Sequence, residues 1–204
     1  KQFQTHYVNY LRLQNFKTRE QEIAHLMGNY DFIAVSERMD ESLVVLSMLL
    51  KIPVADVVVL PSKLSGGYDD GRSKKGCVKL QKKWSTPKID KYLYGDFLEN
   101  NWDYRLYQAV NISLDRTIDA LGRDKVEKGV ANYRQLLEQN EIECRTKAVF
   151  PCPIPEGLKK AYFHTFLSEQ SCYYEDAGCG YKCTDKVLQN ASNEEWKRLQ
   201  KQQL

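Results

Sequence analysis

The sequence predicts an α/β protein with a parallel sheet, partial in this chain, a helical C-terminal half and a disulfide-rich tail. Two short apolar runs, at residues 32–35 and 57–60, flank a helical segment at residues 40–50. Two strands joined by such a helix form a βαβ unit, which implies parallel strands and a right-handed crossover. From Asn101 onward, apolar residues recur every three or four positions, as in helices.

The first part of the chain is predicted to be helical. Residues 2–13 carry apolar side chains at helical spacing. Thr18 to Gln21 has the pattern of a capping box, which starts a short helix that ends near Gly28.

The two predicted strands differ from the helix between them in length. Four apolar residues, 32–35, suit a buried strand, whereas residues 43–50 are long enough for a helix that is packed on several sides. Pro53 ends this helix, and Pro61 closes the second strand at residues 57–60.

A charged turn lies between the first predicted strand and the helix, in the sequence VSERMDES. Glu37 could take a proton or a sugar hydroxyl, and the guanidinium of Arg38 could bind an anion. The alternative is local, because Asp40, Glu41 and Ser42 are residue types that favour a helix N-terminus without any role in chemistry.

A basic, glycine-rich loop follows at residues 62–88. Ligands of open α/β folds bind beyond the carboxyl ends of the strands, so this loop could receive an anionic group through Lys79, Lys82 and Lys83. A solvated loop is the alternative interpretation.

Helices are expected from residue 101 to about 140, with a break at Gly122 and Asp124. Three prolines between residues 151 and 155 then exclude a helix. We therefore predict an α/β part at residues 1–150 and, at residues 151–204, a Pro/Cys-rich tail with a terminal helix at 193–204.

Composition limits the partners of the chain. The 204 residues are 42% hydrophobic and carry a formal net charge of +3, which is too small a field to indicate a nucleic-acid partner. No apolar run is long enough to span a bilayer, so a membrane anchor, if there is one, is expected outside this chain.

Cysteines and glycosylation motifs favour the secretory pathway. Two sequons start at Asn111 and Asn190. A cluster of cysteines near the C-terminus predicts two or three disulfides, and a zinc site is disfavoured because its usual paired spacing is missing. The clustered residues are Cys144, Cys152, Cys172, Cys179 and Cys183.

Three segments carry a family resemblance: residues 31–50, residues 100–123 and the helix at residues 125–139. Together they resemble the galactose 3-O-sulfotransferase family, in which a turn with Asp-Glu-Ser precedes an aliphatic helix and a Leu-Tyr segment runs into a sequon. The resemblance covers residues 30–140.

The resemblance implies a P-loop-like sulfotransferase fold and a Golgi enzyme, part of a single-pass membrane protein. The donor would be 3′-phosphoadenosine 5′-phosphosulfate, and the acceptor a hydroxyl of a galactose-like sugar on a glycolipid or glycan. Glu37 would act as base; the donor would meet Lys79, Lys82 and Lys83; no metal is implied. The substrate-binding residues would be Arg38, Asp40, Trp84 and Trp102.

The donor-binding loops of the family are not found in this sequence. We therefore expect these residues to be the acceptor-side, C-terminal part of a longer enzyme. The alternative is a non-catalytic luminal domain without the donor site, in which aromatic residues stack on a sugar; these are Trp84, Tyr92, Tyr94, Trp102 and Tyr104.

Overall fold

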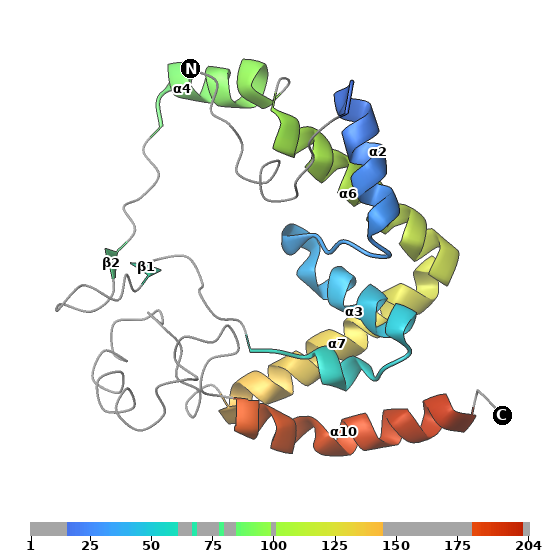
Figure 1. Ribbon diagram of the computed structural model, residues 1–204. Helices are drawn as coiled ribbons and strands as arrows, with labels where there is room; N and C mark the ends of the chain where they lie inside the picture. Colours follow the sequence, from blue (N-terminus) through green and yellow to red (C-terminus); the bar gives the residue numbers. More distant parts are fainter. Residues whose placement is uncertain are drawn as a thin grey trace. The chain divides into compact units, whose positions relative to one another are not determined.

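The computed structural model describes residues 16–60, 67–68, 78–79, 85–98, 101–144 and 181–201. These residues are mainly helical (Figure 1). The α-helices are α2 (Arg19–Asn29), α3 (Met39–Leu50), α4 (Pro87–Tyr92), α6 (Trp102–Leu121), α7 (Arg123–Cys144) and α10 (Tyr181–Lys201). The shorter helical segments are η1 (Ser36–Arg38), η2 (Val54–Val57) and η3 (Leu93–Phe97). The strands are β1 (Gly67–Tyr68) and β2 (Val78–Lys79), which pair antiparallel.

The prediction of a parallel sheet is wrong for the described residues. Residues 32–35 form no strand, and Val57 lies in η2. A strand needs a neighbour for its backbone groups, but the Ser42 hydroxyl bonds both the N–H and the carbonyl of Val35. Val35 and Val58 are nevertheless buried, with 3% exposed each. The apolar runs indicated burial correctly only in part, because Val59 is 55% exposed. A short apolar run also does not distinguish a strand from an irregular segment.

The chain divides into two compact units that interleave along the sequence. The first unit takes in residues 1–46 and 84–127, and the second takes in residues 47–83 and 128–204. The proposed boundary near residue 150 and the helix expected at residues 2–13 lie outside the described residues.

In the first unit, α2 packs against α6. The predicted start of α2 is confirmed, since the Thr18 hydroxyl oxygen accepts a hydrogen bond from the Gln21 N–H at 3.3 Å. The Asn101 side chain caps α6 in the same way, accepting from the Tyr104 N–H at 3.0 Å. The buried apolar residues of this unit are Leu26, Val35, Val44, Val45, Trp102, Val110, Leu114, Ile118 and Val126.

The predicted break between the two long helices is also confirmed. Helix α6 ends at Leu121 and α7 begins at Arg123. Gly122 between them has φ of 94°, a conformation that side chains with a Cβ rarely adopt. Its N–H donates to the Asp119 carbonyl at 3.2 Å, which closes the last turn of α6.

In the second unit, η2 packs against α10. A disulfide joins Cys144, the last residue of α7, to Cys183 in the first turn of α10. The terminal helix expected at 193–204 is therefore longer than predicted at its N-terminal end. The buried apolar residues of this unit are Val54, Ala55, Val58, Leu60, Val130, Tyr133, Cys144 and Leu188.

Candidate functional site

The charged turn at residues 35–42 is held by backbone and hydroxyl contacts. The Arg38 N–H donates to the Val35 carbonyl at 3.0 Å, which closes η1. The Ser42 hydroxyl accepts from the Val35 N–H at 2.9 Å and donates to the Val35 carbonyl at 3.2 Å. Ser42 is 1% exposed, so these bonds lie inside the protein. The turn is thus a rigid entry into α3, without a preceding strand.

Arg38 is engaged by two carboxylates of the first unit. Its Nε lies 2.5 Å from Glu41 Oε2, and its Nη2 lies 2.9 Å from Asp115 Oδ1 on α6. The hydrogen bond with Glu41 contributes most to raising the pKa of Arg38 above its ordinary value; burial opposes this effect, and the bond with Asp115 adds to it. Arg38 therefore stays charged and ties the turn to α6.

Glu37 and Asp40 directly precede Arg38 and Glu41, respectively, in the sequence. The Glu37 side chain is exposed, and its carboxylate accepts a hydrogen bond from the Ser36 hydroxyl at 2.9 Å. Asp40 is in the first turn of α3, where a negative charge interacts favourably with the helix dipole. Glu37 is the one of the two that faces solvent, and it has lone pairs left for a further donor.

A second feature of the first unit is a shallow hollow of about 490 Å³, which we name the tyrosine hollow. It is lined by Tyr94, Leu98, Tyr104, Arg105 and Gln108. Tyr94 is 66% exposed. The Arg105 guanidinium lies 3.6 Å from the Glu20 carboxylate of α2, so the cation is oriented at the hollow's edge. The lining combines an aromatic surface with a forked cation and an amide.

The tyrosine hollow brings together two of the five aromatic residues that the sequence suggested for sugar stacking, Tyr94 and Tyr104. Tyr92 instead lies beside Phe97, with ring centroids 6.0 Å apart. Trp102 is buried in the first unit with 7% exposed, so it offers little surface to a ligand. Trp84 lies outside the described residues.

The basic loop is described only in part. Lys79 is in β2, opposite Gly67 of β1, and its side chain is not among those described. Lys82 and Lys83 lie outside the described residues. Their role in binding the donor therefore stays a prediction.

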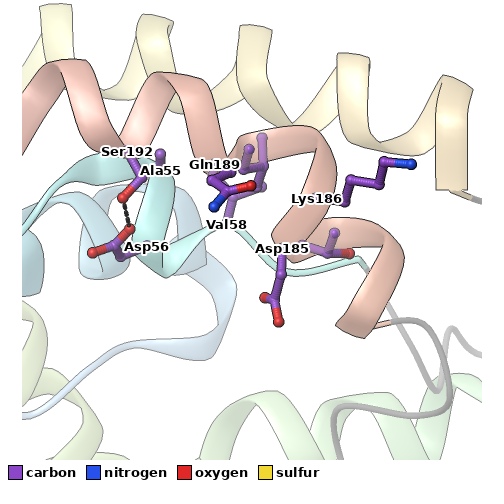
Figure 2. Close-up of a pocket in the computed structure, with 9 residues that line it drawn as sticks. Ala55, Asp56, Val58, Asp185, Lys186, Gln189 and Ser192 are labelled. Atoms are coloured by element: carbon purple, nitrogen blue, oxygen red, sulfur yellow. Dashed lines mark hydrogen bonds between the residues drawn. The ribbon is translucent and has the colours of Figure 1, made fainter.

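The second unit has a polar hollow of about 440 Å³ between η2 and α10, which we name the aspartate hollow (Figure 2). Ala55, Val58 and Leu188 are its buried apolar lining. Asp56 accepts a hydrogen bond from the Ser192 hydroxyl at 2.5 Å and another from the Trp196 indole N–H at 3.1 Å. The other lining residues are Thr184, Asp185, Lys186 and Gln189. Both Asp56 oxygens are thus used to attach α10 to η2.

Both sequons lie within helices. Asn111 is in α6, and its amide N–H donates to the Tyr107 carbonyl at 3.1 Å. Asn190 is exposed near the middle of α10. Of the cysteines predicted to form disulfides, Cys144 and Cys183 are paired, while Cys152, Cys172 and Cys179 lie outside the described residues.

The described residues contain neither a metal-ion cluster nor a membrane-spanning helix. No group of three or more His, Cys, Asp or Glu side chains there could hold a metal ion. No helix in the described part of the chain has both the length and the apolar character needed to cross a membrane.

Sequence reasoning missed three residues that the structure makes prominent. The sequence pattern indicates only that Ser42 belongs to the helix start, whereas in the structure its hydroxyl bonds the backbone of Val35, seven positions earlier. Arg105 and Gln108 were not singled out at all. Gln108 follows Tyr104 by four positions in a predicted helix, and this spacing indicates that the two residues share one face of the helix. Arg105, one position after Tyr104, has no such signal.

Comparison with known proteins identifies no relative of this chain. No family model matches the chain, and neither a curated protein nor a solved structure is detectably similar to it.

Proposed function

We propose that this chain forms the acceptor-side part of a carbohydrate sulfotransferase of the Golgi lumen. The reaction would transfer a sulfuryl group from 3′-phosphoadenosine 5′-phosphosulfate to a hydroxyl of a galactose-like sugar on a glycolipid or glycan. The resemblance of residues 30–140 to galactose 3-O-sulfotransferases supports the reaction class. The proposal does not depend on a parallel sheet, which the described residues lack.

The observation that carries the sugar-binding part is the tyrosine hollow. A galactose ring has one apolar face of C–H groups, which can stack on an exposed ring such as that of Tyr94. Its hydroxyls need donors and acceptors, which Arg105 and Gln108 supply. The volume of about 490 Å³ lies within the range of small-ligand sites and is sufficient for a sugar unit.

Glu37 is our candidate for the base of the reaction. The acceptor hydroxyl oxygen would form a bond to sulfur while the bond between sulfur and the donor's phosphate oxygen breaks, and the hydroxyl proton would pass to the Glu37 carboxylate. The exposed position of Glu37 on a rigid turn supports this role, because a base has to reach the acceptor without losing a structural bond. The leaving group is adenosine 3′,5′-bisphosphate.

One observation favours a second function, a non-catalytic sugar-binding domain. Arg38, which the resemblance suggested as a substrate contact, has its guanidinium committed to Glu41 and Asp115. A domain with the tyrosine hollow alone would bind a galactoside and transfer nothing.

The test of sugar binding uses the purified chain and methyl β-galactoside, with saturation-transfer NMR as the measurement. We expect Tyr94→Ala to weaken binding about fivefold or more, since stacking on an aromatic ring is worth on the order of 1 kcal/mol or more. Tyr92→Ala is the matched control, because this exposed tyrosine does not line the hollow. Absence of binding by the unsubstituted chain would overturn both functions.

The test of catalysis is sulfate transfer from labelled donor to a β-galactoside by the longer enzyme of which this chain would be the acceptor-side part, because the donor-binding loops are not in this sequence. Glu37→Gln keeps the shape of the side chain and removes the base, so turnover should fall by about two orders of magnitude while KM and the melting temperature change little. Full turnover by Glu37→Gln would exclude this residue as base. Binding without transfer by the unsubstituted protein would select the non-catalytic function.

A further inference from the structure

We infer that Asn190 is an N-glycosylation site that accepts its glycan only before α10 docks onto η2. Its occupancy is then set by competition between glycan transfer and folding of the second unit. The inference does not depend on the sulfotransferase proposal, because it rests on contacts of the second unit and on the secretory-pathway setting that the cysteines and sequons favour.

The sequon is built into the contact between α10 and η2. The Ser192 hydroxyl, the third residue of the motif, donates to Asp56 Oδ1 at 2.5 Å (Figure 2). One turn later, the Trp196 indole N–H donates to Asp56 Oδ2 at 3.1 Å. Glu195 Oε2 accepts from the Val54 N–H, the first N–H of η2, at 3.0 Å. Three side chains of α10 therefore hold the motif against one short segment.

Glycan transfer needs an accessible hydroxyl at the third residue of the sequon and an extended backbone, and the contacts of α10 with η2 remove both. The Asn amide nitrogen forms a bond to the anomeric carbon of a lipid-linked oligosaccharide, the bond from that carbon to the pyrophosphate oxygen breaks, and the amide loses a proton. The hydroxyl of the third residue distinguishes a sequon from any other asparagine, so the transferase has to contact it. In the folded chain this hydroxyl is bonded to Asp56, and the helix keeps the motif from extending into an enzyme cleft.

A glycan that is already attached is compatible with the folded unit. The Asn190 side chain is exposed, and among the described residues it has no hydrogen-bond partner to lose. Asn111 differs, because it is half-buried and its amide is bonded within α6. The docked helix is therefore compatible with either a glycosylated or an unmodified Asn190.

The window for transfer closes early. Asp56 is synthesised long before Ser192, so the docking partner is already present when the sequon is made. The disulfide between Cys144 and Cys183 then tethers α10 at its first turn, seven positions before Asn190. Closing a disulfide restricts the unfolded chain and shifts the balance toward docking.

The experiment compares two states of the same purified chain with an oligosaccharyltransferase and a lipid-linked oligosaccharide. One sample is folded and oxidised; the other is reduced, unfolded in urea and diluted into the reaction. Peptide mass spectrometry, after enzymatic release of the glycan in heavy water, measures the occupancy of Asn190. We expect at least about tenfold higher occupancy in the unfolded sample. Equal occupancy in both samples, or none in an unfolded sample when a control peptide is modified, would overturn the inference.

A second arm tests the role of the contact in secreting cells. Asp56→Ala removes the acceptor of the hydrogen bonds from Ser192 and Trp196, and it should raise the occupancy of Asn190. Cys183→Ser should raise it as well. Asp185→Ala is the matched control, because Asp185 also lines the aspartate hollow but receives no bond from Ser192. An increase of the same size in the Asp185 variant, or no increase in the Asp56 variant, would contradict the proposed competition.

Discussion

Ser42 is the residue that fixes the position of the charged turn. Its single hydroxyl satisfies both backbone groups of Val35, one as acceptor and one as donor. Ser42 and Val35 are 1% and 3% exposed, so water cannot replace the hydroxyl without entering the core. A small, buried polar side chain in the first turn of α3 thus supplies the backbone hydrogen bonds that a neighbouring strand would supply in a sheet.

We predict that Ser42→Ala lowers the free energy of unfolding by about 2–3 kcal/mol, because two buried backbone groups lose their partner. Urea unfolding followed by circular dichroism measures the change. Ser36→Ala is the control, since Ser36 is exposed and its hydroxyl bonds the side chain of the neighbouring Glu37, and its effect should stay within about 0.5 kcal/mol. Equal effects of the two substitutions would contradict the structural role of Ser42.

At the scale of elements, a single glycine separates α6 from α7, two long helices that are adjacent in the sequence. Gly122 ends α6 with φ of 94° and ψ of 111°. An added Cβ would find space, since the nearest atom, the Lys125 Cβ, is 3.9 Å away. The requirement for glycine is therefore conformational, and a clash plays no part in it.

We predict that Gly122→Ala destabilises the protein by about 1–2 kcal/mol, because alanine is strained at this φ. Gly28→Ala should have the opposite sign and stabilise α2 by up to about 1 kcal/mol, since this glycine is helical and an added Cβ meets no atom within 4 Å. Melting curves of both variants provide the comparison. A stabilising Gly122→Ala would show that the junction relaxes.

At the scale of the whole molecule, each unit is assembled from segments that are distant in the sequence. In the second unit, Val54 bonds Glu195 across 141 positions. The disulfide between Cys144 and Cys183 closes a separation of 39 residues in the same unit. Next to it, Asn140 is fully buried, and its amide N–H donates to the Thr184 hydroxyl at 3.2 Å. The attachment of α10 thus combines a covalent bond with part-buried hydrogen bonds.

We predict that Cys183→Ser lowers the stability of the second unit by about 3–4 kcal/mol, which is the chain-entropy value for a loop of roughly this length. Hydrogen exchange should show the loss first in α10. Addition of a reductant should lower the melting temperature of the unsubstituted protein by more than that of the serine variant. A reductant effect of the same size on both proteins would mean that another disulfide dominates.

The sequence by itself determined the local features of this protein. The cap at Thr18, the break at Gly122 and the long helices after Asn101 depend on side chains within four residues of each other, so their patterns were sufficient. The clustered cysteines predicted disulfides, and one pair, Cys144 and Cys183, is present. The turn into α3 at residues 35–42 was also located correctly, whereas the strand expected before it is not present in the described residues.

Only the tertiary structure decided what the buried segments pair with. An apolar run favours burial of a segment, but a strand exists only if another strand supplies the hydrogen bonds, and the backbone of Val35 is bonded by Ser42 instead. The tyrosine hollow arose for the same reason, because η3 and α6 place Tyr94 and Tyr104 at one depression. Likewise, Ser192, the third residue of the sequon at Asn190, bonds the carboxylate of Asp56, which is 136 positions away in the sequence. Long-range contacts of this kind leave no periodic pattern in the sequence, because each depends on the path of the whole chain.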